Sequence, residues 1–146
     1  MTRAVTADDG ATAERGDGAP TRLPLGDARG AAAAAREFVG QVLDLAGWDP
    51  AVVDDAKTVV SELVVGALAR GRNPHELTVT LDDDVGQVRL EVSAEGRLPP
   101  QVYEGREEGM ALVHGIAAEH GSRPAGDGRV LWAVLLRKPP TQTSRS

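Results

Sequence analysis

The sequence predicts an α+β domain, a two-layer sandwich in which helices cover one face of a largely antiparallel mixed sheet. Two long segments with apolar residues at helical spacing come first in the chain. Two short segments follow, in which apolar and polar residues alternate on either side of a turn. Such a hairpin has one apolar face, which the helices can cover. A third helical pattern and a last strand complete the order helix, helix, hairpin, loop, helix, strand.

The predicted domain covers residues 23–138. Residues 1–22 are small and charged, without a periodic apolar pattern, and we expect them to be disordered. The tail 139–146, PPTQTSRS, has the same character. A chain of 146 residues is long enough for one domain with a buried core.

The two N-terminal helices have recognisable capping residues. The first is expected from Asp27, its N-cap, to about Ala46, and Gly47 suits the C′ position. The second begins after Asp49 as N-cap, with Pro50 at the first helical position. Its apolar residues form one stripe: Ala56, Val59, Val60, Leu63, Val64, Ala67 and Leu68.

The hairpin strands and the last helix and strand follow from the same patterns. The strands carry Leu77, Val79 and Leu81, then Val88, Leu90 and Val92, around a DDDVG turn. The loop 93–108 leads to a helix with Met110, Leu112, Val113, Ile116 and Ala117 on its apolar side. The final segment, RVLWAVLLR, is apolar on both faces, which predicts an interior strand.

Composition excludes several classes of function. The net charge of −6 and the presence of only four aromatic residues argue against a nucleic-acid surface. There is no cysteine, hence no disulfide or thiolate metal site. The longest alanine run, 31–35, is far shorter than the roughly 20 apolar residues of a membrane span. The N-terminus has no signal pattern, so we expect a cytoplasmic protein.

One face of the second helix is unusual. Glu62 and Gly66 lie one turn apart, opposite the apolar stripe, and Val65 and Ala69 share their face. Glycine inside a helix costs about 1 kcal/mol relative to alanine. The face therefore either packs against another element, with Glu62 solvated, or admits a loop, a ligand or a partner. The helix alone favours packing.

The segment 54–71, DDAKTVVSELVVGALARG, resembles the N-box helix of the histidine-kinase-like (GHKL, or Bergerat) ATP-binding fold. It is most similar to the RsbW-type anti-sigma factors, which are serine kinases. The family motif reads Ser-Glu-Leu-Val-x-Asn-Ala, and Ser61, Glu62, Leu63, Val64 and Ala67 match it. Further segments resemble the family in the same order: REFV at 36–39, LEVS at 90–93, GMALV at 109–113 and VLWAVL at 130–135.

The resemblance implies a role for each pocket position, and the chain departs from several. In the family, the acid at Glu62 is the candidate general base, and an asparagine one turn later binds the Mg²⁺ of ATP. Gly66 stands at the asparagine position and has no side-chain oxygen. A family aspartate that binds the adenine amino group corresponds to Ala94. Glu95 follows, but in a strand it would point to the opposite face.

The phosphate segment also departs from the family pattern. In the family, Gly-x-Gly-Leu before the third helix offers backbone amides to the phosphates. Here Gly109 and Met110 occupy the end of that segment, and Gly96 lies in the glycine-bearing loop before it. Glu107 stands at the earlier glycine position, where its carboxylate would repel phosphate. Acids at a helix start are also ordinary complements of the helix dipole, and both interpretations stay open.

These departures predict a pseudo-kinase. A hydrogen bond to a charged group contributes roughly 1.5–3 kcal/mol. Since about 1.4 kcal/mol is tenfold in affinity, losing several would turn a micromolar Kd into a millimolar one. We therefore expect no cofactor and no metal site. Glu62 would be a vestigial catalytic acid, and the weakened nucleotide positions would be Gly66, Ala94, Gly96, Gly109 and Met110.

The first hypothesis is a regulatory, anti-sigma-factor-like protein that binds a sigma factor or a STAS-domain anti-anti-sigma antagonist, and that can form a homodimer. The alternative is an active RsbW-type serine/threonine-protein kinase that holds ATP and Mg²⁺ through water and phosphates. A third hypothesis is a scaffold module with a different protein partner. Other chemistry is disfavoured. His75, His114 and His120 are scattered, with no acid at ligand spacing on a shared face, and Ser61 has no histidine partner nearby in the sequence.

Overall fold

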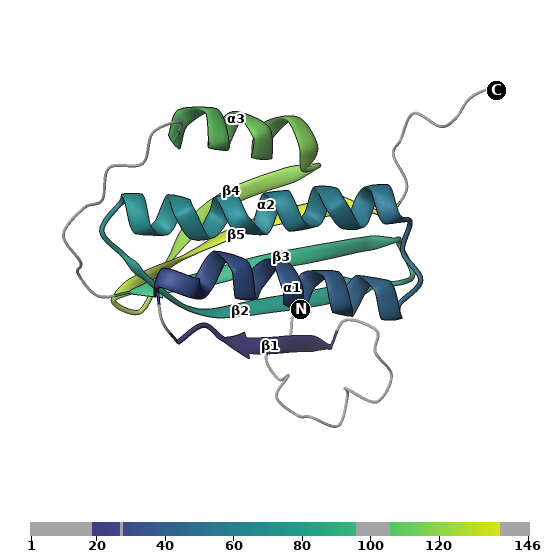
Figure 1. The fold of residues 1–146 in the computed structure, drawn as a ribbon, viewed down its shortest axis with the longest axis horizontal. Coiled ribbons are helices and arrows are strands. Elements are labelled where there is room, and N and C mark those ends of the chain that lie inside the picture. The colour runs from purple at the N-terminus through teal and green to yellow at the C-terminus, as the bar shows by residue number, and fades with distance from the viewer. Residues whose placement is uncertain (1–18, 27, 96–105, 138–146) are drawn as a thin grey trace.

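A computed structural model describes residues 19–26, 28–95 and 106–137, the side chains of 28 and 106–110 excepted. The elements are, in order, β1 (Pro20–Pro24), the short 3-10 helix η3 (Ala28–Gly30), α1 (Ala31–Leu45), α2 (Pro50–Ala69), β2 (Asn73–Asp82), β3 (Gln87–Glu95), α3 (Arg106–Ile116), β4 (Glu119–Ala125) and β5 (Gly128–Leu136). Figure 1 shows the long helices α1 and α2 side by side across the strands.

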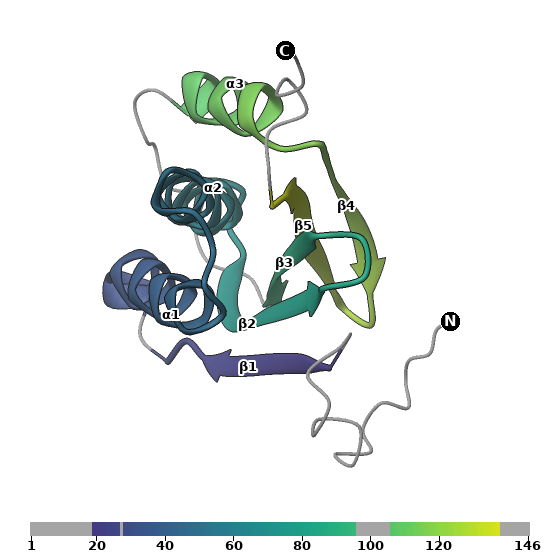
Figure 2. The same ribbon diagram turned by 90° about the vertical axis from the view of Figure 1, so that its right-hand side faces the viewer.

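The predicted α+β fold is confirmed. The strands form one sheet in the order β1-β2-β3-β5-β4, and the helices lie on one of its faces (Figure 2). Every strand pairing in the described ranges is antiparallel, so this part of the sheet is not mixed. Helix α2 contacts α1 on one side and α3 on the other, and it also contacts β2, β3 and β5. It is therefore the central helix of the layer.

Two edge strands were not expected from the sequence. The boundary expected at residue 22 falls inside β1, which pairs with β2 and sets Leu23 opposite Leu77. β4 pairs with β5. β1 has proline at both ends, and β4 is polar and contains glycine and proline, so neither shows the alternation of a half-buried strand. Edge strands tolerate such residues, because one side of the backbone needs no partner. Residues 1–18 and 139–146 lie outside the description.

The predicted helix ends are largely confirmed. The Oδ1 of Asp49 accepts a hydrogen bond of 2.9 Å from the Ala51 amide, and Pro50 opens α2. Gly47 follows α1 with φ of 79°, as a C′ residue does. The start of α1 differs from the expectation: the helix begins at Ala31, and Gly30 is its N-cap without a side-chain hydrogen bond. Asp27 lies outside the described residues.

A single core fills the space between the helices and the sheet. The predicted stripe of α2 is buried throughout: Ala56, Val59, Val60, Leu63, Val64, Ala67 and Leu68. β5 lies between β3 and β4, which confirms it as an interior strand. On the face of β5 away from the helices, the Trp132 ring lies 4.4 Å from the Arg89 guanidinium. This contact gives the apolar Trp132 a partner on that face of the sheet.

Candidate functional site

The second face of α2 is packed rather than open to solvent. Gly66 is buried, Ala69 is 4% exposed, and Glu62 and Val65 are partly buried. Since α2 lies between α1 and α3, its apolar stripe meets the sheet while its flanks meet the two other helices. The small residues at 66 and 69 suit such a crowded position.

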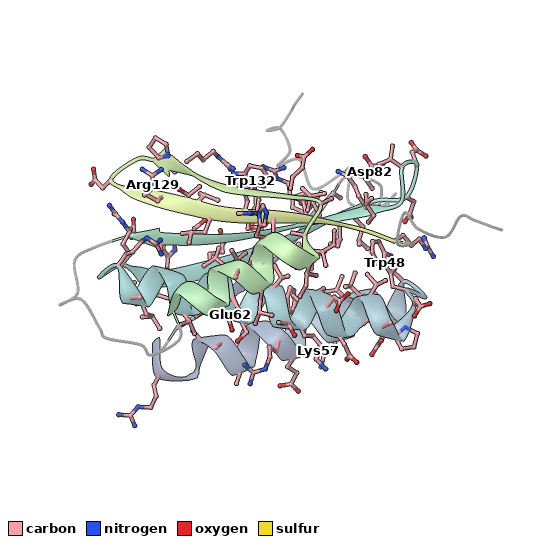
Figure 3. All side chains as sticks on the ribbon, turned by 90° about the horizontal axis from the view of Figure 1, so that it is seen from above. Trp48, Lys57, Glu62, Asp82, Arg129 and Trp132 are labelled. Carbon is pink, nitrogen blue, oxygen red and sulfur yellow. The ribbon has the colours of Figure 1, made fainter. Side chains whose placement is uncertain are left out.

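Glu62 lies near the middle of α2 and is labelled in Figure 3. Within the described ranges its carboxylate has no hydrogen bond or ion pair. The neighbouring Ser61 hydroxyl accepts a hydrogen bond of 3.1 Å from the Arg36 guanidinium of α1. That contact ties the start of the N-box-like motif to the first helix, and it supplies no general base to Ser61.

Gly66 offers only its backbone. Its carbonyl accepts a hydrogen bond of 3.1 Å from Nη1 of Arg70, one turn further along. Side chains in a helix lean toward its N-terminus, so the Arg70 side chain lies back over position 66. The guanidinium thus satisfies a carbonyl near the helix end. A guanidinium therefore lies against the backbone of the residue that occupies the family's magnesium-binding position.

Ala94 is 1% exposed and forms a cross-strand pair with Arg129 of β5. Residues paired in this way share a face of the sheet, so the arginine projects to the helix side. Glu95 is exposed, and its carboxylate lies 3.7 Å from the His75 imidazole. Position 94 therefore has a methyl group and a nearby guanidinium, and the next carboxylate is paired elsewhere.

The remaining pocket positions are in part outside the description. Gly96 is outside the described residues, and so are the side chains of residues 106–110. Gly109 and Met110 are inside α3, which begins at Arg106. The helix therefore starts before Gly109, whereas the resemblance places the glycine segment ahead of the helix.

A cavity of about 230 Å³ lies between α2, β4 and β5. Its apolar wall consists of Leu63, Ala67 and Leu131. Its polar wall consists of Arg70, Arg72, His120, Ser122 and Arg129, with Gly121 between. Arg129 is the cross-strand partner of Ala94, and Arg70 binds the carbonyl of Gly66. The cavity thus borders two of the expected nucleotide positions.

This cavity was not predicted from the sequence, because β4 was not predicted. His114 and His120 meet at its edge: Nδ1 of one lies 3.4 Å from Nε2 of the other. In the described part of the chain, no three histidine, aspartate or glutamate side chains gather as a metal site would require. With Arg70, Arg72 and Arg129 in its lining, the cavity is basic.

Comparison with known proteins supports the fold. No protein-family model matches the chain, and no curated protein matches it. The crystal structure of the RsbU and RsbW domains of Rv1364c from Mycobacterium tuberculosis is similar, with a TM-score of 0.61 and 21% sequence identity. The match covers 80% of this chain and 32% of that one, so the chain spans about a third of its length. This likeness supports an RsbW-like fold. No helix in the described ranges is long and apolar enough to cross a membrane.

Proposed function

We propose that the protein is a regulatory, anti-sigma-factor-like protein that acts by binding another protein, and that its nucleotide site is degraded. The observation that carries the proposal is the pairing of buried Ala94 with Arg129. The adenine amino group is a hydrogen-bond donor and needs an acceptor. Arginine has five N–H donors and no acceptor, so neither Ala94 nor Arg129 can accept the hydrogen bond of the adenine amino group through its side chain.

The metal position supports the same conclusion. Mg²⁺ takes oxygen ligands in a near-octahedral arrangement. Gly66 has no side-chain oxygen, and its carbonyl already accepts a hydrogen bond from Arg70. The guanidinium would also repel a divalent cation placed there. Both halves of the MgATP site are thus disfavoured by residues of this chain.

The partner follows from the resemblance. RsbW-type proteins bind a sigma factor or a STAS-domain antagonist, and we propose the same partner classes here, together with homodimerisation. A cytoplasmic location accords with these partners. The Arg36–Ser61 hydrogen bond is one contact between α1 and α2, which also pack through a shared apolar core.

Calorimetry with MgATP and MgADP tests the loss of nucleotide binding. We expect no saturable binding at low micromolar concentration, and a saturable micromolar isotherm would refute the pseudo-kinase. Incubation of a captured STAS partner with labelled ATP tests the kinase alternative. Phosphate transfer that disappears in Glu62→Gln would establish that alternative.

A pull-down from the native cytoplasm tests the partner class. Recovery of a sigma factor or a STAS-domain protein is the expected result, with mass spectrometry as the readout. Reproducible recovery of an unrelated protein alone would instead support the scaffold hypothesis.

A further inference from the structure

The cavity between α2, β4 and β5 collects positive charge in an acidic protein. The chain has a net charge of −6, yet Arg70, Arg72 and Arg129 all line this one cavity. None of the three forms an ion pair with a carboxylate in the described ranges. A recess lined by charge of one sign concentrates its field and attracts counter-charge.

The guanidinium groups are held in place with donors to spare. Nε and Nη2 of Arg129 lie 3.3 and 3.0 Å from the Ser122 hydroxyl oxygen. Arg70 uses Nη1 on the Gly66 carbonyl at 3.1 Å. Each guanidinium has five N–H donors, so most of them stay available. The Ser122 hydroxyl accepts from Arg129 and can donate its own hydrogen to a ligand.

Arg72 adds a guanidinium without a partner in the described part of the chain. It directly follows Gly71, whose φ of 76° turns the chain away from the end of α2. The amide of Arg72 donates to the Ala67 carbonyl at 3.0 Å, which fixes the backbone at the cavity. Planar guanidinium groups bind carboxylate and phosphate through paired hydrogen bonds.

The apolar wall of the cavity comes from α2 and β5. Leu63, Ala67 and Leu131 form it and belong to the buried core. A ligand that fills the cavity therefore needs an anionic group for the arginines and an apolar part for this wall. The volume, about 230 Å³, is below the range of about 300–1,000 Å³ typical of drug-sized ligands. It suits a molecule of roughly ten non-hydrogen atoms.

We infer that this cavity binds a small organic anion, with a carboxylate or phosphate group on an apolar body, directly through Arg70, Arg72 and Arg129 and without a metal ion. This function goes beyond the proposed protein partner and does not depend on it. Such a ligand would couple to α2 through Arg70 and to β4 through Ser122. Its binding would stabilise the folded protein by mass action.

Calorimetry with phenyl phosphate, benzoate, inorganic phosphate and phenol tests the inference. Phenyl phosphate or benzoate should bind saturably, inorganic phosphate at least tenfold more weakly, and phenol not at all. Whichever of the first two binds more tightly identifies the anionic group. Equal affinity for inorganic phosphate and phenyl phosphate would show that the apolar wall does not contribute to binding. Saturable binding of phenol would show that the ligand needs no negative charge. Either result would refute the inference.

Arginine variants locate the site. Arg129→Gln and Arg72→Gln should each weaken binding of the better probe tenfold or more, since each removes charged hydrogen bonds. Arg123→Gln is the matched control, because this β4 arginine binds Glu91 at 3.1 Å on the other face of the sheet. The affinity of the Arg123→Gln variant for the better probe should stay within twofold of that of the unmodified protein. Equal weakening in all three variants, or saturable binding by none of the probes, would overturn the inference.

An arginine variant could also lose binding because it unfolds. NMR chemical shifts of the unmodified protein locate the site without any substitution. In the unmodified protein, the backbone amide resonances of Gly121 and Ser122 should shift on titration with the better probe, while that of Asp84 in the hairpin turn should not. Shifts spread evenly over the surface would contradict a defined site. The pull-down that tests the protein partner does not depend on ligand binding in this cavity. The anion inference and the proposed function can therefore be refuted separately.

Discussion

Restoring the adenine carboxylate is a direct test of how the nucleotide site was lost. The pair of substitutions Gly66→Asn and Ala94→Asp replaces the two missing family side chains. The structure predicts that this pair is insufficient, because Arg129 is the cross-strand partner of residue 94. Cross-strand Cβ atoms lie about 4.5–5.5 Å apart, well within the reach of an arginine. The new carboxylate would pair with Arg129 instead of a purine.

The size of this effect follows from the interaction that must be broken. Position 94 is 1% exposed and Arg129 is partly buried, so water would compete with the ion pair only in part. A hydrogen bond to a charged group contributes about 1.5–3 kcal/mol, which corresponds to roughly 10–150-fold in Kd. A triple variant that adds Arg129→Ser should therefore bind MgADP more tightly than the double variant by about that factor.

Calorimetry with MgADP measures the difference, and adding Arg123→Ser in place of Arg129→Ser is the control. Stability should move in the opposite direction to affinity: the triple variant should unfold at a lower temperature, because its buried carboxylate has lost a partner. Equal MgADP affinity in the double and triple variants would refute the role of Arg129. Absence of binding in both would contradict the alignment of residue 94 with the adenine aspartate.

Three further predictions concern stability. Leu43→Ala should lower the free energy of unfolding by about 2–5 kcal/mol, because Leu43 is 0% exposed. Leu45→Ala, in the same helix and 90% exposed, should change it by less than about 0.5 kcal/mol in the same urea titration. Asp49→Ala should cost about 1 kcal/mol of helix capping, and Asp49→Ser should retain most of it; thermal denaturation distinguishes the two. Gly121→Ala would place a Cβ atom 3.0 Å from Cζ2 of Trp132. It should cost about 1 kcal/mol or more and change the tryptophan emission spectrum.

The elements that the sequence predicted are those with a strong local signal. α2 has an N-cap, a first-position proline and an unbroken apolar stripe, and each is found in the structure. The hairpin and the interior position of β5 also follow from apolar periodicity. In these cases burial repeats at the period of the element, so the pattern is visible without the partner.

The missed elements owe their structure to a partner strand. β1 and β4 have backbone hydrogen bonds to β2 and β5 but no alternating apolar face. Two of the cavity's polar residues, His120 and Ser122, belong to β4. The cavity therefore depends on a pairing between distant segments that no local pattern shows. The contact between His114 and His120 escaped prediction for the same reason, since it joins a helix to that strand.

The carbonyl of Gly66 links the N-box-like segment of α2 to the basic cavity. Arg70 leans back over this position and donates to its carbonyl at 3.1 Å. Any residue at 66 would offer the same carbonyl, so this hydrogen bond does not by itself require glycine. Glycine costs about 1 kcal/mol inside a helix, whereas a hydrogen bond from a charged group contributes about 1.5–3 kcal/mol, less where water reaches it. The hydrogen bond therefore offsets much of the cost of glycine. It also fixes the guanidinium of Arg70 at the cavity, so the departure from the N-box motif lies next to the proposed anion site.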